Sequence, residues 1–297
     1  MGYRSATALR QAIRSRGSEL VAQGLLSATD QVETQFVHDR FPCRVFSGAG
    51  AESWMLKGGA GVLARAPLAR RTTDIDLASS AQDLNEMRQD LLSRVSRPLG
   101  DFLVFRFSDE KPIRAHAPHS PGLRCRFRVF WGTDELSTRV SVDLVSPSSP
   151  FWESDELVPV NRIEVDGIPS FRYHVLPTHR QIAEKVCAVH GTWTTGPSTR
   201  VKDMIDIVIL ATTQTVRYRA LQDALVEEHL WRGLPMRRTF TPPPQWRERY
   251  SREASRSPAT AKWLNFHEAT DLIQRFLTPP GGVNPDSHWN PSRLVWE

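Results

Sequence analysis

The chain has 297 residues, 40% of them hydrophobic and 24% charged, which is typical of an ordered globular protein with one large or two modest domains. No run of 18 apolar residues and no apolar signal segment occurs, and the three cysteines are widely dispersed, so we expect a cytoplasmic protein without a membrane span, a disulfide scaffold or a zinc ribbon. The formal net charge is +5, and only five of the 38 basic residues are lysines, so the arginine-rich surface favours a polyanionic partner such as nucleic acid.

The first 45 residues are predicted to form an N-terminal helical segment. Apolar positions recur at helical spacing over residues 6–27, and a second helix is expected over 29–38. We expect this segment to pack against the core that follows or to cap it.

Residues 46–175 alternate between strand and helix patterns and are predicted to form an α/β core. A glycine-rich stretch leads into a turn at Gly58-Gly59, and the strand pair 102–108 and 123–131 is expected to form a hairpin. The other elements expected here are helices over 61–66 and 81–95 and strands over 73–78, 138–146, 162–165 and 169–173.

Residues 176–297 change to a helical pattern. Helices are expected over 178–190, 199–213, 216–231, 245–254 and 265–277, with a stiff proline-rich linker over 239–244 and no assigned structure after residue 278. The predicted fold class is therefore α/β (α+β), with a mixed-sheet core followed by a helical C-terminal domain.

The segment Met55 to Leu77, MLKGGAGVLARAPLARRTTDIDL, carries the strongest chemical signal. Alternate residues of a strand share a face, so Asp74 and Asp76 point one way while the apolar residues between and after them point into the core. Two adjacent carboxylates repel each other unless a cation joins them, and an oxygen-only pair next to a glycine turn suits Mg²⁺ with a triphosphate. The alternative is a solvated strand edge next to an ordinary turn.

A third acid, Asp143, lies on a later strand. Val140, Val142 and Leu144 share one face of that strand, and Asp143 lies on the opposite face. If this strand lies beside that of Asp74 and Asp76, Asp143 could complete a metal clamp or act as a base on the attacking hydroxyl. The alternative is a surface aspartate at a strand end.

Two helices of the C-terminal region carry further candidates. Lys185 lies beside an apolar stripe and could reach phosphate oxygens, or it could be a lysine whose stem is buried and whose ammonium reaches water. Asp203 and Asp206 are adjacent on the next helix, which also carries Arg200 and Lys202. Such acids need cationic partners, and a structural buried ion pair is as reasonable here as a catalytic role.

Four motifs, LKGGAGVLAR with RTTDIDL, SVDL, IAEKVCA and RVKDMIDIVIL, occur in one order over residues 50–210. In this combination the chain resembles the AbiEii/MenT family of nucleotidyltransferase toxins, which belongs to the DNA polymerase β-like nucleotidyltransferase superfamily. The C-terminal helices also look like the helical end of that family. The resemblance implies a toxin of a bacterial toxin–antitoxin system that transfers nucleotides, with CTP or UTP as expected donors, to the 3′ acceptor end of tRNA. Partners would be the nucleoside triphosphate, tRNA and a cognate antitoxin.

The resemblance also assigns roles to residues. It implies Mg²⁺ on Asp74 and Asp76, with Asp143 as metal ligand or base, and it places Lys185 and Asp203 among the catalytic residues. The implied nucleotide-binding residues are Lys57, Gly58, Gly59, Arg70, Thr72, Lys185, Arg200 and Lys202. Ala60 stands where the superfamily often has Ser or Thr, so phosphate would be held by backbone amides and by basic side chains such as Lys57 or Lys185.

Two other classes of function share these motifs. A small-molecule nucleotidyltransferase of the aminoglycoside type would use the same core but needs an acidic pocket, which the basic charge balance disfavours. A catalytically inactive nucleic-acid-binding or antitoxin-docking protein would need neither the intact acid pair nor Lys185.

Overall fold

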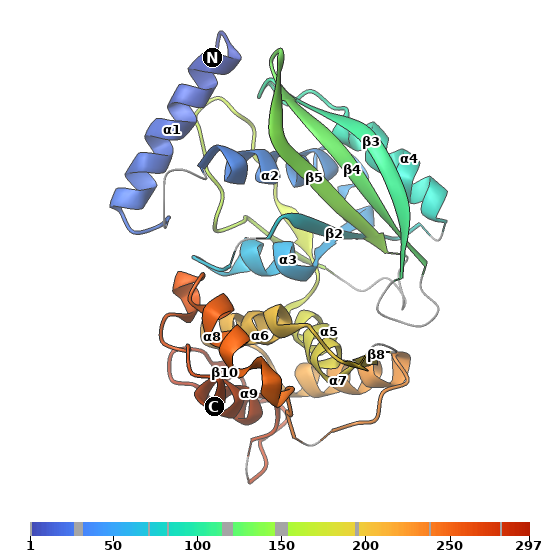
Figure 1. Cartoon of the computed structure of the whole chain (residues 1–297), viewed down its shortest axis with the longest axis vertical. Coiled ribbons are helices and arrows are strands. Elements are labelled where there is room, and N and C mark those ends of the chain that lie inside the picture. Colours follow the sequence, from blue (N-terminus) through green and yellow to red (C-terminus); the bar gives the residue numbers. More distant parts are fainter. Residues whose placement is uncertain are drawn as a thin grey trace. The chain divides into compact units, whose positions relative to one another are not determined.

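The computed structural model describes residues 2–26, 32–70, 72–81, 83–114, 121–145, 154–193, 196–237, 239–279 and 281–297 (Figure 1). The chain divides into two compact units. Among the described residues, the first unit holds the chain up to Leu68 and from Thr72 to Val175. The second holds Ala69, Arg70 and the chain from Leu176 onward.

The first unit consists of a mixed sheet with helices. Its elements in chain order are α1 (Ala6–Ala22), α2 (Val32–Val45), η1 (Ala51–Ser53), β1 (Trp54–Lys57), α3 (Gly58–Arg65), β2 (Asp74–Ser79), α4 (Leu84–Val95), β3 (Leu103–Arg114), β4 (Pro121–Trp131), β5 (Asp134–Val145), β6 (Asp155–Leu157) and β7 (Tyr173–Val175).

The described strands form a seven-stranded sheet in the order β3-β4-β5-β2-β1-β7-β6. β2 runs parallel to β5 and β1 parallel to β7, and the other neighbours are antiparallel. The predicted hairpin is present as β3 and β4, which run side by side with β5 in Figure 1. The mixed sheet and its helices confirm the predicted fold class.

The core of this unit lies between the sheet and the helices α1, α2 and α4. Val140, Val142 and Leu144 of β5 are fully buried, as alternation along the strand predicts. Their neighbours on β2, Ile75 and Leu77, are buried in the same cluster. The acidic residues of both strands consequently lie on the opposite face of the sheet.

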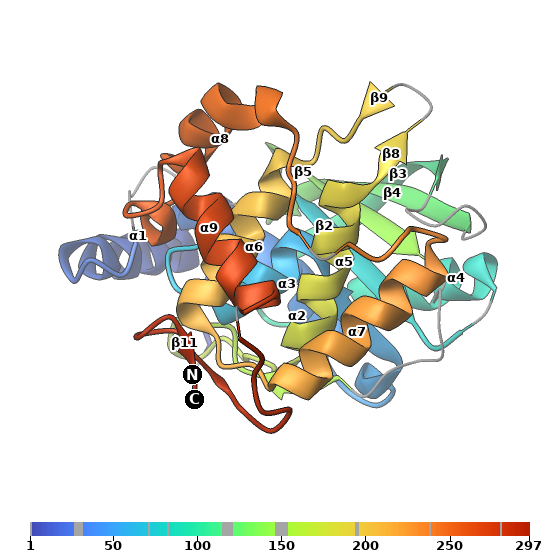
Figure 2. The same ribbon diagram turned by 90° about the horizontal axis from the view of Figure 1, so that it is seen from below.

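The second unit is mainly helical. Its elements are α5 (Thr178–His190), β8 (Thr192–Trp193), β9 (Gly196–Pro197), α6 (Val201–Thr213), α7 (Tyr218–Trp231), η2 (Pro244–Trp246), α8 (Arg247–Ala254), η3 (Pro258–Thr260), α9 (Phe266–Leu277), β10 (Trp289–Asn290) and β11 (Val295–Trp296). Figure 2 shows α5 and α7 side by side, with α6 on the other side of α5. Among the described residues, no helix is long and apolar enough to cross a bilayer.

Several local predictions differ from the structure. The expected Gly58-Gly59 turn is the first turn of α3, so the helix begins three residues before the predicted start at Gly61. Residues 162–165 form no strand, and the strand expected over 169–173 is β7 at Tyr173–Val175. The tail after residue 278 contains the hairpin of β10 and β11, where the Trp289 indole donates to the carbonyl of Ala211 at 2.6 Å.

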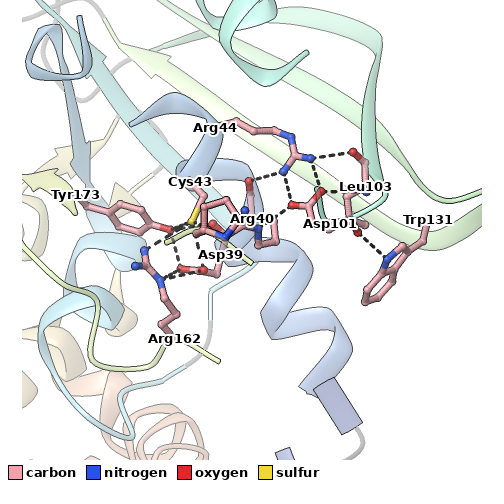
Figure 3. A network of polar contacts seen from close by, with 10 residues as sticks. Asp39, Arg40, Cys43, Arg44, Asp101, Leu103, Trp131, Arg162 and Tyr173 are labelled. Carbon is pink, nitrogen blue, oxygen red and sulfur yellow. Dashed lines mark hydrogen bonds and ion pairs between the residues drawn. The ribbon is translucent and has the colours of Figure 1, made fainter. Parts of the chain in front are cut away.

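A buried ionic cluster ties α2 to the start of β3 (Figure 3). The carboxylate of Asp101 accepts hydrogen bonds from Arg44 at 2.7 and 2.9 Å and from Arg40 at 2.7 Å. All three side chains are almost completely buried. Burial alone raises the pKa of Asp101, but the hydrogen bonds and positive charges of Arg44 and Arg40 outweigh it and hold the pKa below its ordinary value of 3.8.

The ionised Asp101 carboxylate should therefore make a large contribution to the free energy of unfolding of the first unit, and this contribution should be lost at acid pH. We expect Asp101→Asn to lower the free energy of unfolding at pH 7 by roughly 3–5 kcal/mol, because two buried guanidinium groups lose their counter-charge. A depressed folded-state pKa stabilises the fold above the unfolded value of 3.8 and ceases to do so as the pH falls below it. The difference between wild type and variant in urea unfolding should thus be constant from neutral pH to about pH 5 and shrink below about pH 4.

The control is Asp109→Asn, which removes an exposed carboxylate bonded to Arg126 at 2.9 Å. It should cost less than about 1 kcal/mol at any pH. Equal losses from both substitutions would contradict a special role for the buried cluster.

Candidate functional site

Four neighbouring strands place charged side chains in one row across the sheet. Asp76 of β2 lies opposite Lys57 of β1 on one side and opposite Asp143 of β5 on the other. Asp143 in turn lies opposite Arg124 of β4. Neighbouring strands are about 4.8 Å apart, so the row brings two carboxylates together between two cationic residues.

The acid pair of β2 has the orientation expected from strand alternation. Asp74 is exposed and Asp76 is half-buried, whereas Ile75 between them is buried. Asp74 lies opposite Ser141 of β5, one row along the same face as Asp76. Thr72 stands just before the strand, where its hydroxyl donates to the backbone carbonyl of Asp74 at 3.1 Å.

Gly58 is required by the position of Asp76. Its φ is +56°, in the left-handed region, and an added Cβ would lie 1.8 Å from Oδ2 and 2.6 Å from Cγ of Asp76. The Asp76 carboxylate therefore occupies the space next to the glycine, at the start of α3. A helix N-terminus offers unpaired backbone N–H groups, which suit a carboxylate or a phosphate.

Arg124 was not singled out from the sequence, but its guanidinium lies at one end of this row, next to Asp143. Its Nε and Nη2 donate to the two oxygens of Asp143 at 2.5 and 2.6 Å. The hydrogen bonds that Arg124 donates to Asp143 raise the pKa of Arg124, and the negative charges of Asp143, Asp74 and Asp76 raise it further. All three carboxylates thus act electrostatically on one guanidinium.

The donor set fits a metal held by two carboxylates better than one held by three. In the described parts of the chain, no group of three or more His, Cys, Asp or Glu residues could hold a metal ion. Arg124 engages both oxygens of Asp143, whereas Asp74 and Asp76 carry the other two carboxylates of this row and the next. One or two carboxylates, completed by substrate phosphates and water, is the set that Mg²⁺ takes in nucleotide enzymes.

The second unit holds another ionic network, built on α5 and α6. Lys185 Nζ donates to Asp206 at 2.6 Å and to Asp203 at 3.1 Å, and Arg70 donates to both oxygens of Asp206 at 2.6 and 2.7 Å. Arg200 donates to Asp203 at 2.6 Å. The expected cationic partners of the two acids are therefore Lys185 and the arginines.

Because the network is buried, its charges strongly shift one another's pKa values. Burial raises the pKa of Asp203, but the charges of Lys185 and Arg200 outweigh it and lower the pKa to about 2. Burial lowers the pKa of Lys185, but Asp206 and Asp203 more than compensate and raise it. The Lys185 ammonium is buried and does not reach water, and Asp203 and Asp206 have the buried ion-pair environment that was one of the two expectations for them. Arg200 is partly exposed and Lys202 is exposed.

The predicted site residues thus fall into two groups. Lys57, Gly58, Gly59, Asp74, Asp76 and Asp143 come together on the sheet face of the first unit, with Thr72 at its margin. Arg70, Lys185, Arg200 and Asp203 come together in the second unit, where Lys202 is also found. Arg124 joins the first group, and its place at an alternate position of the LRCRFRVFW strand was the available sequence signal.

Comparison with known proteins identifies the family. Residues 44–275 match the family model described as nucleotidyl transferase AbiEii toxin, type IV toxin–antitoxin system. No curated protein matches the chain significantly.

Two solved structures resemble the chain at low identity. MenT4, a nucleotidyltransferase toxin from Mycobacterium tuberculosis, is 14% identical over 89% of this chain and 99% of its own, with a TM-score of 0.48. JHP933 from Helicobacter pylori is 13% identical over 83% of this chain and 93% of its own, with a TM-score of 0.44.

The family match spans most of the chain and contains every residue of the carboxylate row and of the second ionic network. It confirms the family expected from the sequence motifs. The chain belongs to the AbiEii family of nucleotidyltransferase toxins from type IV toxin–antitoxin systems.

Proposed function

We propose that this toxin transfers a nucleotide from a nucleoside triphosphate, with CTP or UTP as the expected donor, to the 3′ end of tRNA. The added nucleotide would block aminoacylation and hence translation, and a cognate antitoxin would counter the activity. The main support is the row of Lys57, Asp76, Asp143 and Arg124 beside the Gly58 N-terminus of α3. Since donor and acceptor are both cytoplasmic molecules, we propose that the protein acts in the cytoplasm.

The proposed reaction is an in-line displacement at the α-phosphorus. A bond forms between the acceptor 3′-hydroxyl oxygen and the α-phosphorus, the bond to the bridging oxygen of the β-phosphate breaks, and pyrophosphate leaves. Asp143 lies next to Asp76 across two paired strands, where it would receive the hydroxyl proton. Positioning and electrostatic stabilisation supply most of the catalysis in such a reaction.

Asp74 and Asp76 would hold Mg²⁺, which when bound neutralises charge on the triphosphate. The backbone N–H groups at the start of α3 would contact phosphate oxygens. Lys57 and Arg124, at the two ends of the row, would stabilise negative charge that develops on the phosphates.

The second unit is proposed to contribute through its own ionic network. Lys185 keeps Asp203 and Asp206 charge-balanced, and this balance holds Arg70 and Arg200 in fixed positions. Contacts of Arg200 and Lys202 with phosphate remain a prediction from the family resemblance.

A transfer assay with two different acceptors would separate the proposed function from its alternatives. Each of the four triphosphates, labelled at the α-phosphate, is incubated with total tRNA or with an aminoglycoside, and the tRNA 3′ ends are then sequenced. We expect Mg²⁺-dependent label in tRNA, strongest with CTP or UTP. Label in the aminoglycoside, or RNA binding without transfer of any nucleotide, would contradict the proposal.

The acid pair provides the test of mechanism. We expect Asp76→Asn to lower transfer to tRNA at least about 100-fold, because the site loses a charge needed in the transition state. The matched control is Asp134→Asn, which removes an exposed carboxylate at the first residue of β5. Full activity of folded Asp76→Asn protein would refute the assignment.

Gly58 provides a second test. Gly58→Ala should displace the Asp76 carboxylate and reduce transfer nearly as much as Asp76→Asn, because the new Cβ would lie 1.8 Å from Oδ2. Gly233→Ala is the control: its φ of +61° imposes the same backbone strain, but nothing lies within 4 Å of the added Cβ. If both alanine variants lose activity equally, backbone strain and not the Asp76 contact is responsible.

A further inference from the structure

The strands β3, β4 and β5 have one covered and one open face. Helices α2 and α4 contact these strands, and Phe105, Phe127 and Val129 are buried on the covered side. On the other side, exposed arginines outnumber the acids that lie among the described residues there, Asp109 bonded to Arg126 and Glu135 bonded to Arg128. We name this surface the arginine face and define it by Arg106 of β3, Arg126, Arg128 and Phe130 of β4 and Arg139 of β5.

Strand register arranges the arginines in rows. Arg128 lies opposite Arg106 on one side and opposite Arg139 on the other. Like charges placed directly opposite each other in a sheet are destabilising. Among the described residues, the acid bonded to this row is Glu135, which accepts from both Arg128 and Arg139. The row therefore carries excess positive charge, which a bound polyanion would neutralise.

The arginine face is continuous with the proposed catalytic row. Arg126 lies in the next row, opposite Ser141, and Arg124 lies in the row after that, opposite Asp143. Successive rows on one face are two residues, or about 6.7 Å, apart. A polyanion that lies along the arginine face from Arg128 would thus reach Asp143 and Asp76 while still in contact with the sheet.

An aromatic ring lies among the charges. The guanidinium carbons of Arg106 and Arg128 are 4.4 and 5.4 Å from the centroid of the Phe130 ring. Guanidinium planes and aromatic rings are the surfaces on which unpaired bases stack, whereas paired bases in a duplex are not available to them. The combination of guanidinium groups with an aromatic ring favours single-stranded nucleic acid as the partner over a duplex or an acidic protein.

We infer that the arginine face binds the single-stranded 3′ end of the RNA acceptor and guides it to the carboxylate row. The inference rests on the proposed function, because it names the path by which the acceptor reaches the site. Arg106, Arg128 and Arg139 bind the phosphates, and Phe130 stacks with a base. Arg124 lies where the RNA 3′ end would reach the row of Asp143 and Asp76.

Direct binding measurements test the inference without turnover. Fluorescence anisotropy with an RNA hairpin that carries an unpaired 3′ tail is compared for wild type, Arg106→Ala/Arg128→Ala and Phe130→Ala. The double variant should raise Kd about 10-fold and reduce the slope of log K against log salt concentration by about 1.4, since two phosphate contacts to a single strand are lost. Phe130→Ala should raise Kd at least about 5-fold without changing the slope.

The control is Arg256→Ala/Arg293→Ala, which also removes two exposed guanidinium groups, each paired with a nearby glutamate. It should leave Kd and slope unchanged. Wild-type binding by the double variant, or equally tight binding of a blunt duplex, would overturn the inference. In transfer assays the loss in the double variant should appear in the KM for RNA.

The two proposals fail separately. If wild type transfers no nucleotide to any RNA, the proposed function fails, while the anisotropy comparison still decides whether the arginine face binds RNA. If transfer occurs but the double variant keeps the wild-type Kd and KM for RNA, the proposed function stands and the arginine face is excluded.

Discussion

The parallel pairing of β2 with β5 brings the carboxylates of Asp76 and Asp143 side by side, and their mutual repulsion has to be offset by neighbouring positive charge. The sheet supplies it from both sides, through Lys57 on β1 and Arg124 on β4. Gly58 supplies the space, because its missing Cβ leaves room for the Asp76 carboxylate at the start of a helix. Sheet register, a left-handed glycine and a helix end together form the place where we propose that a metal-bound triphosphate binds.

The two units use buried charge in a similar way. In the first, Asp101 is shared by Arg40 and Arg44, and in the second, Asp206 is shared by Arg70 and Lys185. A buried carboxylate with two or more cationic donors is fully hydrogen-bonded, and removal of any one member leaves an uncompensated charge. Such clusters restrict the positions of the elements that carry them. Arg70 lies between α3 and β2 in the sequence, and its guanidinium is held by Asp206 of α6.

Much of the first unit could be predicted from the sequence because its strands have one buried face. The alternation around Asp76 and Asp143 correctly separated core residues from site residues. Arg124 could not be assigned in this way, because its partner depends on the register of β4 against β5, which contains an irregularity between Arg128 and Phe130. A shift of one residue would have turned Arg124 to the core face.

Long-range contacts explain the remaining differences. β10 and β11 are two residues each, too short for a periodic signal, and they are stabilised by the contact of Trp289 with Ala211. The strand expected around residues 162–165 is absent, and Arg162 there extends its side chain to Asp39 of α2 at 3.2 Å. The bond between Arg70 and Asp206 joins residues far apart in the chain. Local pattern contains no information about such pairs, so it predicted which residues are charged but not which residues they bond to.

The central claim is that the acid pair of β2 and the glycine start of α3 form one metal–triphosphate site. A crystal structure with Mn²⁺ and a triphosphate analogue that cannot be cleaved at the α-phosphate tests it most directly, because the anomalous signal locates the ion independently of the nucleotide. We predict an ion bonded to carboxylate oxygens of Asp74 and Asp76, with phosphate oxygens at the backbone amides of Gly58 and Gly59. A triphosphate bound elsewhere, or an ion without contact to either aspartate, would contradict this account.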